Sequence, residues 1–262
     1  MTQQITALAY IRAFLLLTGA VGQFTAGFAP DLLGWEQTIS TRSFESRTLL
    51  IPGGGAFIIW LPLFFGNIAF AIFAALPSQL RQARMANISW LAAAAFWANT
   101  VRSLYEPIHG PGWISLLLLF GILIPLIFAA IEIRSRETWS APETWAFLPV
   151  LGQAGWISIA CAAGVSQTAL FTGFNPAGLG AEASALLALS IWTILAIPVI
   201  WRVRALAYSG GAAWGLFWIG ATNLSNEVEG IAWTAFVASA GVLVLTGAAK
   251  TDTARSVQAA KT

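Results

Sequence analysis

Charge is scarce in this sequence, and so are the residues that bind metals or form disulfides. Charged residues make up 9% of the 262 positions, whereas a soluble domain has about 25%. The net charge is +2, so nothing suggests a nucleic-acid partner. Cys161 is the single cysteine, which excludes an intrachain disulfide. A metal site needs three or four ligands, and the single histidine, His109, has only Glu106 near it in the sequence. Arg102 and Glu106 are spaced i, i+4, and we expect them to form an ion pair at the membrane interface.

The sequence also lacks the residue sets that carry out most enzymatic reactions. It contains no nucleotide-binding loop, no pair of carboxylates at membrane depth and no serine–histidine–aspartate set. We therefore expect no enzymatic activity, no catalytic residue and no metal. The polar side chains inside the apolar runs are uncharged, and we expect most of them to join helices rather than to contact a ligand. They include Gln23, Asn67, Asn99, Gln153 and Gln167.

Long apolar runs are what the sequence has in abundance. Hydrophobic residues make up 58% of the chain, with a mean hydropathy of +0.75. A helix of about 20 apolar residues can cross a bilayer. The sequence thus predicts an all-α polytopic membrane protein surrounded by lipid. We place eight spans at about residues 5–28, 54–76, 86–105, 112–132, 143–166, 181–201, 206–223 and 230–248.

Positive charge alternates between the connections that join these runs. The second, fourth, sixth and eighth runs are followed by nine positive residues, which are Arg81, Arg84, Arg134, Arg136, Arg202, Arg204, Lys250, Arg255 and Lys261. The other connections hold three, which are Arg42, Arg47 and Arg102. Positive residues concentrate on the cytoplasmic side of membrane proteins. We therefore expect both termini in the cytoplasm, and a bacterial inner membrane suits the short loops.

The first run is expected to stay in the protein as a span. Its start has no basic segment, and Arg12 lies inside the apolar stretch, unlike the pattern of a cleaved signal peptide. Arg12 is about two turns into the helix, so its side chain can extend to the cytoplasmic interface. We favour that role over contact with a ligand.

Tryptophan is unusually frequent, with 13 residues in the chain. Several lie near expected membrane interfaces, where tryptophan commonly anchors a helix. Deeper tryptophans either line a slot for a flat apolar ligand or fill a tightly packed bundle, and composition alone favours packing. The deeper residues are Trp60, Trp97, Trp156, Trp192 and Trp218.

Small residues spaced four apart predict close contacts between helices. Ala160 and Gly164 have this spacing in the fifth run, and Gly211 and Gly215 have it in the seventh. Such pairs let helix backbones approach one another. The contacts could lie within the bundle or between subunits.

Several short motifs occur in a characteristic order. The pattern P-x-x-x-x-F-x-x-x-W-x-x-L-F runs from Pro52 to Phe64, N-I-S-W ends at Trp90, and W-I-S-I-A begins at Trp156. With the leucine-rich fourth run and the long loop before Pro52, these motifs resemble the tryptophan-rich sensory protein family (TspO, the translocator or peripheral-type benzodiazepine receptor family). Two positions depart from its pattern, since Phe64 replaces a tyrosine and Gly164 an asparagine. The resemblance covers about residues 5–170.

This resemblance implies a fold and a ligand. Residues 1–170 would form a five-helix transmembrane bundle with an outer loop at 29–53, often dimeric, that binds porphyrin, haem or another flat apolar molecule below that loop. Residues 171–249 would add transmembrane helices of unassigned role, and 250–262 a cytoplasmic tail. By position, the ligand-binding residues would be Trp35 as a lid, with Phe57, Trp60, Phe64, Asn87, Trp90 and Trp156.

The start of the second run has features that suit the wall of such a site. Pro52 can begin a helix where no N–H is needed. Gly53, Gly54 and Gly55 allow a sharp entry with close backbone approach. Pro62 would kink the helix and free a carbonyl group. The alternative is that these residues only shape helix packing.

Three functions remain open at this stage. The first is a receptor or regulator that binds a tetrapyrrole or lipid-like ligand without catalysis of its own. The second is a transporter of an apolar metabolite, which would need alternating access. The third is an accessory or scaffold subunit of a larger membrane complex, with the added helices as its docking face.

Overall fold

The computed structural model describes residues 5–38, 41, 48–134, 139–175 and 177–259, apart from the side chains of Asp31 and of residues 253–259. Within these ranges the chain is helical and contains no strand. The elements are α1 (Ala7–Leu32), the 3-10 helix η1 (Gly54–Ile59), α3 (Trp60–Ala74), α4 (Pro77–Leu80), α5 (Ala83–His109), α6 (Trp113–Arg134), α7 (Ala141–Thr172), α8 (Ala181–Val203), α9 (Leu206–Ser225) and α10 (Glu229–Ala259).

Every predicted apolar run coincides with a helix, with some differences at the ends. The second run is divided, because a turn of 3-10 helix precedes α3. It begins at Gly54 rather than at Pro52, and Pro62 lies in the first turn of α3, just after the change from 3-10 to α-helix at Trp60. The last helix continues to Ala259, so most of the predicted tail at 250–262 is helical.

Six helical segments of the described chain are long and apolar enough to cross a membrane, which makes this a multi-pass membrane protein. Helices α5 and α9 are not among the six. Both have polar residues that face the protein interior, such as Asn99 and Ser103 on α5 and Ser209 and Asn223 on α9. Inward-facing polar residues lower the hydropathy of a helix without exposing polarity to lipid.

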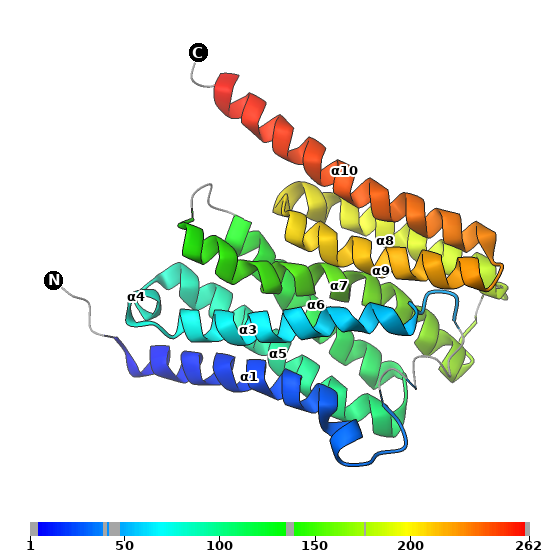
Figure 1. Ribbon diagram of the computed structural model, residues 1–262, viewed down its shortest axis with the longest axis horizontal. Coiled ribbons are helices and arrows are strands. Elements are labelled where there is room, and N and C mark those ends of the chain that lie inside the picture. Colours follow the sequence, from blue (N-terminus) through cyan, green and yellow to red (C-terminus); the bar gives the residue numbers. More distant parts are fainter. Residues whose placement is uncertain (1–4, 39–40, 42–47, 135–138, 176, 260–262) are drawn as a thin grey trace.

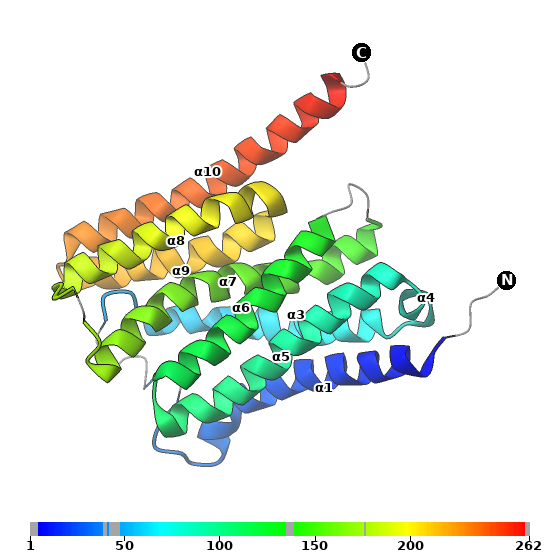
Figure 2. The same cartoon turned by 180° about the vertical axis from the view of Figure 1, so that it is seen from behind.

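The long helices lie side by side in one bundle, and successive connections alternate between its two ends (Figure 1). Helix α1 begins and α10 ends at the end of the bundle where α4 and the α8–α9 connection lie (Figure 1). Viewed from behind, α1, α3, α5 and α6 lie on one side of α7, and α8, α9 and α10 lie on the other (Figure 2). Helix α7 is therefore the central element. In the 18-residue stretch of this helix that is apolar enough to span a membrane, 72% is buried inside the protein.

The ends of α7 are fixed by local sequence. Ser140 and Glu143 form a capping box, in which the Glu143 N–H donates to the Ser140 hydroxyl and the Ser140 N–H donates to the Glu143 carboxylate. The helix ends at Gly173, whose φ of 69° suits a residue without a Cβ.

Helices α7 and α9 cross with their backbones almost in contact. A Cβ atom on Gly211 would lie 2.1 Å from the Gly152 carbonyl oxygen, and one on Gly155 would lie 1.8 Å from the Tyr208 carbonyl oxygen. A Cβ on Gly215 would meet the side chain of Ile159. The predicted small-residue contact of Gly211 and Gly215 thus lies within the bundle.

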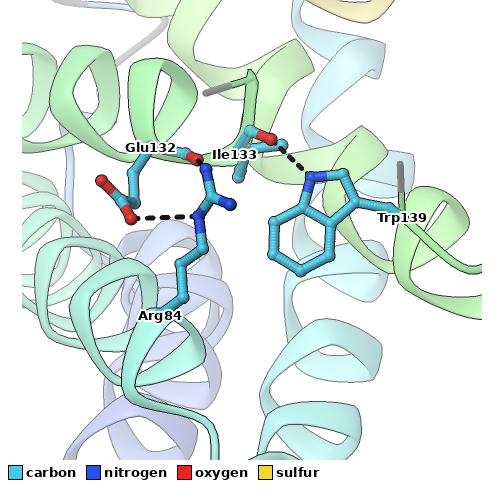
Figure 3. A network of polar contacts seen from close by, with 4 residues as sticks. All are labelled: Arg84, Glu132, Ile133 and Trp139. Atoms are coloured by element: carbon cyan, nitrogen blue, oxygen red, sulfur yellow. Dashed lines mark hydrogen bonds and ion pairs between the residues drawn. The ribbon is translucent and has the colours of Figure 1, made fainter. Parts of the chain in front are cut away.

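A cluster of polar contacts joins α5, α6 and the connection before α7, at the end of the bundle where α1 begins (Figure 3). Arg84 on α5 forms an ion pair with the Glu132 carboxylate at 3.1 Å and donates to the Glu132 carbonyl at 2.9 Å. Its guanidinium lies 5.2 Å from the centre of the Trp139 ring, and the Trp139 indole donates to the Ile133 carbonyl. The cluster links α5 to α6 and to the residues just before α7.

Candidate ligand-binding site

A cavity of about 350 Å³ lies between α1, α3, α5 and α7, near the end of the bundle opposite α4. Residues 50–58 close one side of it, and Ile219 of α9 also reaches it. Its lining residues are Gly27, Phe28, Thr38, Leu50, Ile51, Pro52, Phe57, Ile58, Trp60, Leu61, Phe64, Asn99, Arg102, Ser103, Leu119, Trp156, Ile157, Ile159, Ala160, Ala163, Gln167 and Ile219.

One wall of this cavity is aromatic. The rings of Trp60 and Phe64 are stacked with centroids 4.8 Å apart, as expected for residues one helical turn apart on α3. Trp156 from α7 meets Trp60 edge to face at 6.0 Å, and Phe57 meets Trp156 in the same way at 6.2 Å. Together the four side chains form an aromatic surface on which a flat ligand can make stacking and edge contacts.

The other wall is polar and carries a charge. Asn99, Arg102 and Ser103 come from α5, and Gln167 comes from α7. Arg102 forms an ion pair with Glu106, one helical turn away, and Glu106 also accepts a hydrogen bond from the Ser115 hydroxyl. The predicted i, i+4 pair is therefore present. It lies inside the protein rather than at an exposed interface, since the Glu106 side chain is fully buried.

A chain of buried carboxamides lies next to this wall. Asn99 donates to the Gln23 carbonyl oxygen at 3.0 Å, Gln153 donates to the same oxygen at 3.1 Å, and Asn67 donates to Gln153. The four residues belong to α1, α3, α5 and α7. They join these helices, as predicted, and Asn99 also lines the cavity.

Two hydrogen-bond donors on the lining side chains have no partner among the residues that the structure describes. These are the indole Nε1 of Trp156 and the guanidinium Nε of Arg102. A buried donor without a partner is costly, and a bound molecule can remove that cost by accepting a hydrogen bond. The cavity therefore favours a ligand that combines a flat apolar body with an acceptor or anionic edge.

The mouth of the cavity is apolar. Three lining residues are themselves exposed, with relative exposures of 37% for Phe28, 61% for Ile58 and 42% for Leu61. They belong to α1, η1 and α3, whose outer surfaces would face lipid. An apolar mouth of this kind suits a ligand that enters from the bilayer.

The structure brings four of the seven predicted site residues to the cavity and places three elsewhere. Phe57, Trp60, Phe64 and Trp156 line it, whereas Trp35, Asn87 and Trp90 do not. Trp35 is half-buried in the outer loop, where its backbone N–H donates to the Pro30 carbonyl at 2.8 Å.

Asn87 and Trp90 are exposed on the first half of α5. Nine residues separate Trp90 from Asn99, a rise of about 14 Å along the helix. Because α5 reaches the cavity only with Asn99, Arg102 and Ser103, Asn87 and Trp90 cannot share its wall.

Sequence reasoning missed the polar wall and the contribution of α9. Arg102 was assigned to an interfacial ion pair. Its position four residues before Glu106 within an apolar run is a signal that could have placed it in the interior. Gln167 and Ile219 carry no such signal, because single uncharged residues in apolar helices do not reveal which way they face.

The fold and the cavity define a class, that of polytopic α-helical membrane proteins with an aromatic-walled cavity between their helices. A family model described as TSPO-like protein matches residues 12–248. The chain belongs to the TSPO-like protein family. The match continues through α8 and α9 and into α10, well beyond the motifs seen in the sequence. Comparison of the sequence with curated proteins and with solved structures found no match.

Proposed function

We propose that this protein is a membrane receptor or regulator that binds a flat apolar ligand, such as a tetrapyrrole, in the cavity and performs no catalysis of its own. The observation that carries the proposal is the pairing of two walls. Trp60, Phe64 and Trp156 offer an aromatic surface on one side, and the Arg102 Nε offers an unpartnered donor on the other. A planar molecule with a carboxylate edge matches both walls.

The size and the opening of the cavity support this class of ligand. Small-molecule sites typically have volumes of about 300–1,000 Å³, and this cavity has about 350 Å³. A ligand larger than the enclosed space can extend through the apolar mouth at Phe28, Ile58 and Leu61. Haem or a metal-free porphyrin would act as ligand here, not as a catalytic cofactor.

The proposal includes an orientation in the membrane. All eight long helices would span, with both termini in the cytoplasm of a bacterial inner membrane. The alternation of positive charge along the sequence supports this orientation. The alternation of connections between the two ends of the bundle supports the number of spans, and not the side on which the termini lie. The cavity would then lie in the outer half of the membrane.

Titration with protoporphyrin tests the binding proposal. The absorbance of the porphyrin should be followed rather than protein fluorescence, because the variants remove tryptophans. We expect saturable binding to the wild type, and binding at least tenfold weaker to the Trp60→Ala, Trp156→Ala double variant. Trp90→Ala, which removes an indole outside the cavity, is the matched control and should bind as the wild type does.

Two results would argue against the cavity as the site. One is equal binding to the wild type and to the double variant, provided that the double variant elutes as a folded protein of unchanged size. The other is equal weakening by Trp90→Ala, which would indicate partition onto the outer surface. Flux of porphyrin across liposomes that contain the wild type would instead favour a transporter.

A further inference from the structure

The segment from Leu49 to Ile59 contacts both the cavity and α9. Its residues Leu50, Ile51, Phe57 and Ile58 line the cavity. Two of its backbone carbonyls accept hydrogen bonds from side chains of α9. The segment thus has one face on the candidate ligand and one on a helix for which the sequence gives no role.

Two hydrogen bonds attach this segment to α9. The Trp214 indole donates to the Ala56 carbonyl at 2.8 Å, and the Asn223 amide donates to the Leu49 carbonyl at 2.7 Å. The two acceptors lie seven residues apart, near the two ends of the segment. Both ends are therefore held by the same rigid helix.

The glycines of the segment explain how α9 can come so close. A Cβ atom on Gly55 would lie 2.3 Å from the ring of Trp218, and one on Gly53 would lie 2.8 Å from the Thr222 hydroxyl. A larger residue at either position would require the segment or the facing side chain of α9 to move. The sequence predicts a sharp entry with close backbone approach at these glycines, and Gly53 and Gly55 do lie close to α9.

We propose that α9 is a positioning element of the ligand site, so that ligand binding and the docking of α9 on residues 49–59 stabilise one another. The proposal rests on the proposed function, because it concerns the same cavity. Ile219 adds a direct contact, since it lines the cavity between Trp214 and Asn223 on α9. The unit formed by α8, α9 and α10 would thereby respond to occupancy of the cavity.

The coupling is reciprocal by thermodynamic necessity. If the docked segment binds the ligand more tightly than the undocked segment does, then the ligand must also strengthen docking by the same factor. Loss of one hydrogen bond that holds the segment should weaken ligand binding about two- to tenfold. A faster dissociation rate should account for most of this loss, since the segment closes one side of the cavity.

Trp214→Phe is the variant that isolates this contact. It removes the indole N–H and keeps a ring against Trp218, whose centroid lies 5.8 Å away. We expect a two- to tenfold higher Kd for protoporphyrin, faster dissociation, and faster hydrogen exchange at residues 49–59 in the ligand-free protein. Trp233→Phe is the matched control, because Trp233 is 58% exposed on α10, and it should change none of these quantities.

The outcomes separate this proposal from the proposed function. If the wild type binds protoporphyrin and Trp214→Phe binds it equally well, the coupling is wrong while the binding site stands. Unchanged exchange at residues 49–59 in Trp214→Phe would also overturn it. If the wild type does not bind protoporphyrin, the proposed function fails, and the coupling, which rests on it, fails with it.

Discussion

At the scale of single residues, the interior of this protein is arranged around a few polar side chains in apolar surroundings. Glu106 is fully buried, and its charge is balanced by Arg102 and by the Ser115 hydroxyl. Removing one partner of a buried ion pair leaves an uncompensated charge, which is strongly destabilising. Arg102 also faces the cavity, so this pair connects the stability of the bundle with the proposed recognition of an anionic edge.

Replacing both partners of this pair tests the role of the charge in recognition. The Arg102→Met, Glu106→Met double variant removes the donor without leaving a buried charge behind. We expect its affinity for protoporphyrin, a dicarboxylic acid, to fall about ten- to hundredfold, since a hydrogen bond to a charged group contributes about 1.5–3 kcal/mol. The affinity for the dimethyl ester should change by less than about twofold, because the ester has no charge to pair. An equal loss for acid and ester would contradict this role for Arg102.

The residue scale also shows what the sequence can reveal about the site. The motif from Pro52 to Phe64 and the motif at Trp156 identified the aromatic wall, since all four of its rings belong to them. Trp90 was assigned to the same wall but is exposed on α5. In a membrane helix, lipid and protein interior are both apolar, so an aromatic residue fits either side. The buried face of α5 is marked instead by small and polar residues such as Ser89, Ala92 and Asn99.

At the scale of elements, α7 organises the bundle and α9 packs directly on it. Their contact depends on Gly152 and Gly155 on one helix and Gly211 and Gly215 on the other. The spacing of Gly211 and Gly215 predicted a close helix contact, but the partner helix could not be predicted. The spacing of small residues predicts which face of a helix another helix can approach closely. It does not predict which helix packs there, and the tertiary structure is needed for that.

Two neighbouring glycines on α9 test this crossing. Gly211→Ala places a methyl group against the Gly152 carbonyl, whereas Gly210→Ala meets no atom within 4 Å. We expect Gly211→Ala to lower the free energy of unfolding by about 1–3 kcal/mol, as overpacking usually does. Gly210→Ala should leave it unchanged or raise it slightly, because alanine favours helix more than glycine does. Unfolding in increasing SDS measures both, and equal stability of the two variants would contradict the close crossing.

At the scale of the whole molecule, the eight predicted runs give eight long helices, and the alternation of their connections is preserved in space. Composition and run length were sufficient for this, because a chain must satisfy its backbone hydrogen bonds inside lipid by forming helices. The packing of α9 on residues 49–59 could not be predicted. It depends on contacts between segments about 160 residues apart, for which no local pattern exists.

Whether α5 and α9 each cross the membrane, as proposed, can be tested by labelling single cysteines in cells. The native Cys161 is buried and should not interfere. With eight spans, a membrane-impermeant maleimide should label His109→Cys from outside, and should label Leu206→Cys only after permeabilisation. If neither α5 nor α9 crosses the membrane, the chain has two fewer spans. His109 would then lie in the cytoplasm and Leu206 outside. The reverse labelling pattern would therefore contradict the eight-span arrangement.

The central claim is that the cavity between α1, α3, α5 and α7 holds the ligand, and the place where a porphyrin lies can be measured directly. Illuminated protoporphyrin oxidises indole rings close to it, and mass spectrometry can locate the oxidised tryptophans. If the porphyrin lies in the cavity, we expect Trp60 and Trp156 to be oxidised first, although Trp156 is only 3% exposed. Oxidation concentrated at Trp145 and Trp233, which are 72% and 58% exposed, would instead place the porphyrin on the outer surface and rule out the cavity as its site.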